Sequence, residues 1–264
     1  IERLKSSCID PPHVGDITGA DLFGETALHN IKFIPNINGK FKVWNMPSES
    51  EMVTDRYLVV VDIGGLSATA DNSVICVFDR YWQHNGGVPE VVAEWCGHIP
   101  HYRLAWMAAQ IATWYHNALL VIESNTLESH QTEGYHGEYI LDEISHYYHN
   151  LYCRTSAEQI KQGLPARWGF HTNTQTKTLV CDHQRKVLEH SMYIERCIDA
   201  VYEHQTLEIR STGKIEATDG CRDDRHITRA IGNYICYQQM RLPQEITSQD
   251  ENLYSSNITS MATF

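Results

Sequence analysis

Four stretches of the chain are mainly apolar runs of the kind that form strands buried on both faces: residues 57–62, 73–79, 90–95 and 119–124. Residues 84–87, His-Asn-Gly-Gly, are typical of a tight turn, so the first three runs are predicted to be successive antiparallel strands. Between the third and fourth runs, apolar residues recur at helical spacing over 102–116. The pattern therefore predicts the order β-β-β-α-β, an α/β fold with a mixed central sheet flanked by helices.

The second half of the chain has a more helical pattern. Helices are predicted over 138–148, 174–190 and about 223–239, together with a short strand at 151–153 and a hairpin formed by 206–210 and 214–217. Residues 1–52 contain four prolines with Asn, Gly and Ser between them, which favours a linker or arm. We therefore expect one folded domain over 53–243, followed by a polar tail over 244–264.

Composition narrows the classes of function. The chain of 264 residues carries 33 acidic and 21 basic side chains, a net charge of −12 that argues against a general nucleic-acid coat protein. Its eight cysteines are widely scattered, which favours a reducing intracellular compartment. None of them forms a Cys-x-x-Cys pair, so the sequence does not favour a structural zinc site. No apolar run is long enough to predict a membrane-spanning helix. We expect the chain to be part of a longer protein.

Acidic residues stand at the ends of three predicted elements. Asp62 ends the first strand, Glu123 ends the fourth, and Asp223 and Asp224 open the last helix. If the first and fourth strands are neighbours joined by a right-handed crossover, Asp62 and Glu123 leave the sheet at the same edge. With Asp223 or Asp224 beside them they would form a cage of oxygens, which suits Mg²⁺ or Mn²⁺. Two such ions about 4 Å apart can drive hydrolysis of a phosphodiester bond.

Several motifs then carry a resemblance to a known family. They are Val61-Asp-Ile-Gly-Gly65, Ala70-Asp-Asn-Ser-Val74, Val121-Ile-Glu-Ser-Asn125 and the stretch 216–224, with Lys42-Val-Trp44 and the Gly-x-x-Thr-x-x-x-x-Lys pattern of 169–177. Over about residues 40–240 the chain resembles the C-terminal nuclease domain of the phage large terminase subunit. The resemblance implies an RNase H-like fold and an endonuclease that uses two Mg²⁺ or Mn²⁺ ions to cut double-stranded viral DNA during genome packaging.

The resemblance also implies partners and a setting. These are double-stranded DNA, an N-terminal ATPase motor, the small terminase subunit and the portal protein, with no membrane, in the cytoplasm of a bacterial host that carries a phage or prophage. The chain itself has no Gly-x-x-x-x-Gly-Lys-[Ser/Thr] phosphate loop, so the motor is expected to lie outside these residues.

Residue by residue, the resemblance makes Asp62 the first catalytic carboxylate and metal ligand, Glu123 the second, and Asp223 or Asp224 the third. Which member of the Asp223–Asp224 pair binds metal stays open at this point.

Three further residues have two interpretations each. Asp71 lies near the site or caps a turn. His226 orients a water molecule or is a plain surface histidine. Lys177 contacts a DNA phosphate or is a solvated helix residue.

Other classes of protein share parts of the pattern. A Holliday-junction resolvase or a transposase-like nuclease would have the same fold and acidic residues. An actin-like or sugar-kinase-like ATPase would use the turn at 62–65 with Ser67 and Thr69 to hold phosphate, but needs a second glycine-rich turn that residues 130–240 do not offer. A docking domain rich in Trp and Tyr is a non-catalytic alternative, which metal dependence would separate from a nuclease.

Overall fold

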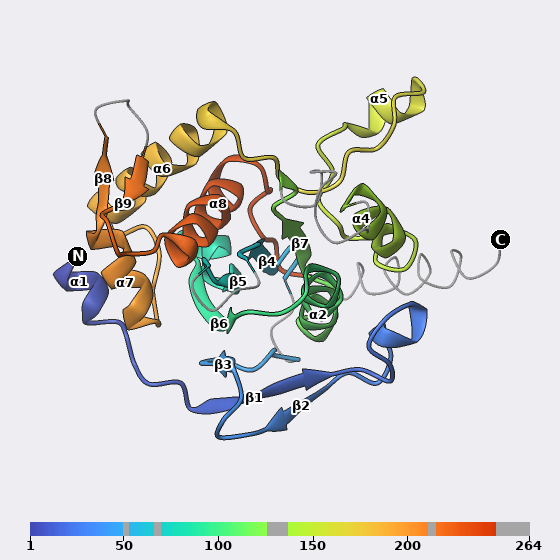
Figure 1. The fold of residues 1–264 in the computed structure, drawn as a ribbon, viewed down its shortest axis with the longest axis horizontal. Helices are drawn as coiled ribbons and strands as arrows, with labels where there is room; N and C mark the ends of the chain where they lie inside the picture. The colour runs from blue at the N-terminus through green and yellow to red at the C-terminus, as the bar shows by residue number, and fades with distance from the viewer. Residues whose placement is uncertain (50–52, 66–69, 126–136, 211–214, 247–264) are drawn as a thin grey trace.

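A seven-stranded sheet forms the centre of the computed structural model, which describes residues 1–49, 53–65, 70–125, 137–210 and 215–246 (Figure 1). The strand order is β2-β1-β3-β6-β5-β4-β7. The strands are β1 (His13–Thr18), β2 (Lys32–Pro35), β3 (Phe41–Val43), β4 (Tyr57–Asp62), β5 (Ser73–Asp79), β6 (Glu90–Gly97) and β7 (Leu119–Ile122). Only β4 and β7 run parallel, and the other neighbours in the sheet are antiparallel.

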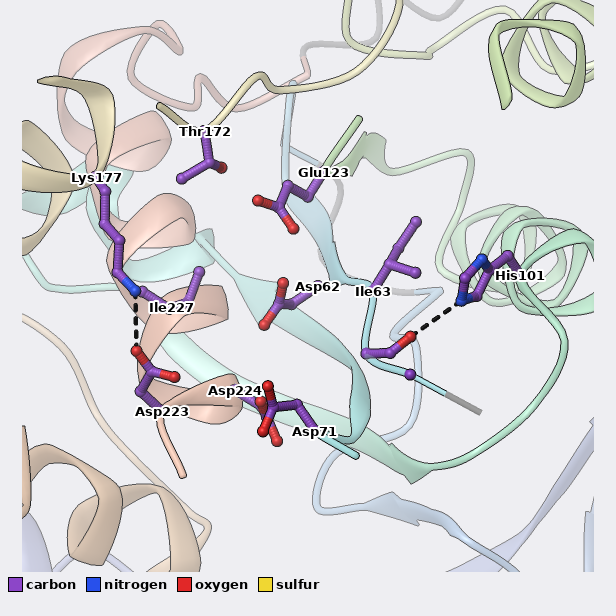
Figure 2. Close-up of a pocket in the computed structure, with 12 residues that line it drawn as sticks. Asp62, Ile63, Asp71, His101, Glu123, Thr172, Lys177, Asp223, Asp224 and Ile227 are labelled. Carbon is purple, nitrogen blue, oxygen red and sulfur yellow. Dashed lines mark hydrogen bonds and ion pairs between the residues drawn. The ribbon is translucent and has the colours of Figure 1, made fainter. Parts of the chain in front are cut away.

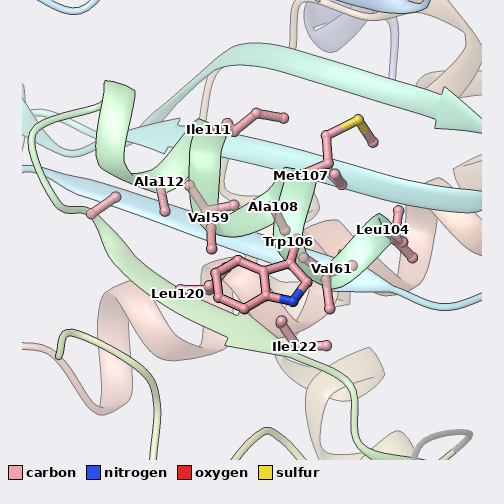
Figure 3. Close-up of a cluster of buried hydrophobic side chains, with 14 of the residues drawn as sticks. Val59, Val61, Leu104, Trp106, Met107, Ala108, Ile111, Ala112, Leu120 and Ile122 are labelled. Carbon is pink, nitrogen blue, oxygen red and sulfur yellow. The ribbon is translucent and has the colours of Figure 1, made fainter. Parts of the chain in front are cut away.

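Helices cover both faces of this sheet. One core cluster joins the sheet to α2 (His101–Trp114) and α4 (Gly137–Ser145), and the other joins it to α6 (Thr174–Glu189), α7 (Ile198–Gln205) and α8 (Asp224–Gln238). Strand β4 contributes side chains to both clusters, because alternate side chains of a strand point to opposite faces. Val59 and Val61 face the α2 side, where Trp106 fills the core (Figure 3), and Leu58 and Val60 face the α8 side.

Smaller elements complete the described part of the chain. They are the short helices α1 (Glu2–Lys5) and α5 (Ala157–Lys161), the 3₁₀ helices η1 (Glu25–Leu28) and η2 (Tyr81–Asn85), and a separate hairpin of β8 (Leu207–Ile209) and β9 (Ile215–Ala217). No helix in these residues is long and apolar enough to cross a membrane.

The predicted core of the fold is confirmed. Strands β4, β5 and β6 are successive and antiparallel, α2 follows, and β7 returns parallel to β4. This is the order β-β-β-α-β expected from the apolar runs, in a mixed sheet flanked by helices.

The N-terminal segment differs from the linker or arm that its prolines favour. Residues 13–43 contribute three strands to the sheet, and β3 pairs with β6 with Phe41 opposite Trp95. Phe41 and Val43 are fully buried. In β1 and β3 buried residues alternate with more exposed ones, and β2 has no buried residue, so all three strands lack the continuous apolar run that marks β4.

Other predicted elements also changed in detail. The first two residues of the turn expected at 84–87 belong to η2, residues 151–153 form isolated bridges instead of a strand, and α7 was not predicted. Residues 66–69, which include Ser67 and Thr69, and most of the predicted tail, 247–264, lie outside the described residues.

Candidate active site

The parallel pairing of β4 and β7 brings two predicted carboxylates together. Val61 pairs with Ile122, and the Glu123 N–H donates to the Val61 carbonyl oxygen at 2.9 Å. Asp62 and Glu123 therefore leave adjacent strands at one edge of the sheet and turn toward each other (Figure 2). The predicted crossover geometry accounts for this placement.

The start of α8 brings the second pair to the same edge. Asp223 is the N-cap residue of α8 and Asp224 is its first helical residue. The Asp224 carboxylate is 3% exposed and accepts a hydrogen bond of 2.8 Å from the Asn72 N–H. This bond ties α8 to the segment that leads into β5.

Backbone packing fixes the loop that follows Asp62. A Cβ added at Gly64 would lie 2.2 Å from the Asp71 carbonyl oxygen, so only glycine allows this approach. The Gly65 N–H donates to the same oxygen at 3.0 Å, and His101 Nε2 donates to the Gly64 carbonyl at 3.0 Å. These contacts hold Asp71 beside Asp224 (Figure 2).

The end of β4, the residues next to β5 and β7 and the start of α8 surround an open pocket of about 420 Å³. Its lining consists of five carboxylates with a few basic, polar and apolar groups: Asp62, Asp71, Glu123, Asp223, Asp224, Lys177, His101, Thr172, Ile63, Gly64, Gly65 and Ile227. The Lys177 ammonium pairs with Asp223 at 3.0 Å. A second pocket adjoins the first and shares Glu123, Thr172 and Lys177 with it.

The crowded carboxylates shift one another's protonation. Burial raises the pKa of Asp62 well above its ordinary value, and Glu123 adds to this through its charge and a hydrogen bond. Burial also raises the pKa of Asp224 to about 6, with Asp71 and Asp223 adding to the rise against the Asn72 hydrogen bond. For Lys177, burial lowers the pKa, but the neighbouring Asp223 outweighs it and the net direction is upward. The pocket thus has more negative charge than its own cation offsets.

This donor set fits divalent metal ions by its chemistry. Carboxylate oxygens are the ligands that Mg²⁺ and Mn²⁺ prefer, and a cation would offset the repulsion that raises the pKa of Asp62. As they stand, no three His, Cys, Asp or Glu side chains in the described residues are arranged to hold a metal ion. In this arrangement Glu123 contributes to the raised pKa of Asp62, and Asp223 is paired with Lys177. Metal binding would exchange these partners for the ion.

The structure decides where the three residues with two interpretations lie. Asp71 lines the pocket. Lys177 lines it too, as the ion-pair partner of Asp223. His226 is not a surface residue: it is 3% exposed, and its Nδ1 lies 2.8 Å from Nδ1 of His204. It is buried in the core and does not line the pocket.

Sequence reasoning did not single out His101 or Thr172 as site residues. His101 reaches the pocket because it opens α2 next to the loop after β4. Thr172 is held there by Asn125, whose amide oxygen accepts from the Thr172 N–H at 2.9 Å. Two motifs of the sequence include one partner each of this contact: Gly-x-x-Thr in 169–172 and Val121-Ile-Glu-Ser-Asn125.

Comparisons with known proteins place the fold. No protein-family model matches the sequence, and no curated protein does. Among solved structures, the large terminase nuclease of thermophilic phage G20c is similar, with a TM-score of 0.50 at 13% identity over 78% of this chain and 91% of that one. The chain is also similar to the Thermus phage P74-26 large terminase nuclease domain (TM-score 0.48, 13% identity, 78% of this chain and 90% of that one). A further similar structure is the human cytomegalovirus terminase nuclease domain (TM-score 0.47, 10% identity, 76% and 91%).

The chain therefore has the RNase H-like fold of large terminase nuclease domains, as the motifs in its sequence led us to expect. At 13% identity this likeness concerns the fold, and the chemistry has to be argued from the site.

Proposed function

We propose that this chain is a metal-dependent endonuclease that hydrolyses phosphodiester bonds of double-stranded DNA, as the nuclease part of a viral terminase large subunit. The observation that carries the proposal is the convergence of Asp62, Glu123, Asp223 and Asp224 at one sheet edge. The four come from β4, β7 and α8, which are far apart in sequence. A purely structural role for so many carboxylates would leave their repulsion without compensation.

Each carboxylate has a role that follows from its position. Asp62 lies between Glu123 and the α8 pair in Figure 2, so it is the residue that would bridge two Mg²⁺ or Mn²⁺ ions. Glu123 would complete the shell on the β7 side, and Asp224 or Asp223 the shell on the α8 side. Ions held by these carboxylates would supply the chemistry of phosphodiester hydrolysis, by activating water and by neutralising charge on the leaving oxygen.

Asp224 is the stronger candidate of the α8 pair. Its carboxylate is fixed by the Asn72 N–H and faces Asp62 and Asp71, whereas Asp223 pairs with Lys177. We propose that Asp224 ligates metal in the first instance. Asp223 would join it when an ion displaces Lys177, whose ammonium would then be available to contact a DNA phosphate.

The wider setting belongs to the same proposal. An N-terminal ATPase motor would hold and move the DNA, and the small terminase subunit and portal protein would complete the packaging machine in the cytoplasm of a bacterial host. The net charge of −12 supports this division, because a chain this acidic needs another part to hold DNA over the pocket.

The experiment is conversion of supercoiled plasmid to nicked and linear forms with Mn²⁺, with Mg²⁺ and with EDTA. Glu123→Ala removes a pocket carboxylate, and Glu189→Ala, at the exposed end of α6, is the matched control. We expect cleavage by the parent and the control with metal only, and none by Glu123→Ala. Equal cleavage in EDTA, or by Glu123→Ala, would contradict the proposal. Four-way junctions cut in preference to linear duplex would favour the resolvase alternative.

A further inference from the structure

The cap of helix α8 comes from another helix. A helix begins with backbone N–H groups that have no partner within it, and the side chain of the N-cap residue usually accepts from the second or third of them. The N-cap residue here is Asp223, a good capping residue by type, yet its side chain makes no capping hydrogen bond. Its carboxylate instead faces Lys177 and the pocket.

Glu203, on α7, supplies the missing acceptor. Its Oε2 accepts from the Arg225 N–H at 2.6 Å and from the His226 N–H at 3.2 Å. These are the second and third helical residues of α8, whose amides an N-cap side chain would normally bind. Glu203 thus caps α8 from outside.

A buried ionic network fixes Glu203 in this role. Arg225 donates through Nη1 to Glu203 at 2.8 Å and through Nε to Glu94 of β6 at 2.9 Å. One turn later, Arg229 pairs with Glu94 at 2.7 Å and with Glu195 at 3.0 Å. Glu203 is 8% exposed and the other two carboxylates are at most 1% exposed. The first turn of α8 is therefore clamped between α7 and the sheet.

We infer that Glu203 is a positioning residue of the site: by capping α8 it leaves the Asp223 carboxylate free to face the pocket. The inference rests on the proposed function, because it concerns the ligands of that site. Without Glu203, the N-cap residue Asp223 is the residue whose side chain is placed by position to accept from the Arg225 and His226 amides. That side chain would turn back onto the helix and leave the pocket, and the first turn would lose its anchor to α7.

The first test is metal binding without DNA. Mn²⁺ is titrated into the chain and free Mn²⁺ is read from its paramagnetic resonance signal. We expect Glu203→Ala to bind Mn²⁺ about tenfold or more weakly than the parent, the usual cost of losing a residue that orients ligands. Glu203→Gln keeps an oxygen for the two amides and should retain most of the affinity.

The control for this test is Glu195→Gln. It changes a carboxylate that is even more deeply buried than Glu203 and is also bound to α8, through Arg229, but that does not contact the first-turn amides. We expect Glu195→Gln to lower thermal stability and leave Mn²⁺ affinity within about twofold of the parent. Parent-like affinity in Glu203→Ala, or an equal loss in Glu195→Gln, would overturn the inference.

A second test needs no metal, so it separates this inference from the proposed function. In EDTA, Asp223→Ala is made in the parent and in Glu203→Ala, and thermal midpoints are compared. If Asp223 takes over the cap, its removal lowers the midpoint more in the Glu203→Ala background. The same effect in both backgrounds would overturn the inference. A parent that binds no Mn²⁺ would overturn the proposed function, while this second comparison would still decide what caps α8.

Discussion

Asp224 is the site residue whose protonation has the clearest consequence for stability. Its pKa is about 6 in the folded protein against an ordinary value of 3.8, because burial and then the Asp71 and Asp223 charges outweigh the Asn72 hydrogen bond. The folded state therefore holds this proton more tightly than the unfolded chain. The resulting stabilisation is fully present below about pH 3.8 and is lost as pH rises through about 6.

Replacing Asp224 should reveal how much stability the folded protein loses when this carboxyl is deprotonated. In EDTA, Asp224→Asn should match the parent near pH 4 and exceed its free energy of unfolding by up to about 3 kcal/mol near pH 7.5. The Asn side chain still offers an oxygen to the Asn72 N–H. Glu203 and His226 also have shifted pKa values, raised and lowered respectively by burial, but they are common to both proteins and largely cancel in the difference. Denaturant unfolding at the two pH values measures it, and a variant less stable at the higher pH would contradict the assignment.

Lys177 competes with any cation for Asp223. Lys177→Met should therefore bind Mn²⁺ about threefold more tightly, equivalent to a partly exposed ion pair worth about 0.7 kcal/mol. Cleavage of DNA should fall, because the side chain that would contact phosphate is gone. Lys186→Met, exposed on the same helix, should change neither quantity. Weaker Mn²⁺ binding in Lys177→Met would show that the ammonium supports the metal site instead of competing for it.

At the scale of elements, α8 matters most, because it carries two site carboxylates and packs directly on the sheet. Gly232 is the point of closest approach: a Cβ there would lie 2.3 Å from the ring of Phe78 on β5. The absence of a side chain lets the helix settle against the central strands.

Gly232→Ala tests this packing. Alanine gains about 1 kcal/mol of helix propensity over glycine, yet the clash should reverse the sign and cost about 1–3 kcal/mol of stability overall. Phe78→Leu makes room for the added methyl group. Gly232→Ala should therefore cost less stability in the Phe78→Leu background than in the parent. The midpoint of urea unfolding is the measurement. A stabilised Gly232→Ala would mean that α8 sits less tightly on β5.

How well an element could be predicted depended on what its local pattern encodes. β4 has an unbroken apolar run because both of its faces are covered, so sequence alone was enough. β1 and β2 have mixed patterns and are the last two strands at one side of the sheet, where pairing with other strands defines them. α7 is eight residues long, and only four of its residues are buried. Its signal was too short to stand out.

The site residues also differ in whether a local sequence pattern could predict their positions. Asp62 and Glu123 could be predicted to meet, because they end strands whose pairing follows from chain order, whereas the Asp223–Asp224 pair was expected beside them only from the resemblance to terminase nuclease domains. Glu203 could not, since in sequence it is one glutamate in a short helix. Its role depends on the packing of α7 against α8, which no local pattern encodes. His226 was misjudged for the same reason, because its partner His204 is also on α7.

On the scale of the whole molecule, charge sets the affinity for DNA. With a net charge of −12, the isolated chain should bind duplex DNA weakly. If it contacts two phosphates, affinity should fall about tenfold between roughly 50 and 200 mM salt. Fluorescence anisotropy of a labelled duplex with Ca²⁺ in place of the active ion measures this. Nanomolar binding that persists at high salt would require a basic surface that the composition does not predict.

The most direct test of the central claim is metal-dependent cleavage by Asp62→Asn. The change removes one charge from the centre of the carboxylate cluster and keeps the shape of the side chain. Asp182→Asn, exposed on α6, is the matched control. The account predicts that parent and control nick plasmid DNA with Mn²⁺ at similar rates, and that Asp62→Asn loses on the order of a thousandfold in rate while remaining folded. Asp62→Asn cutting as fast as the parent would contradict the account.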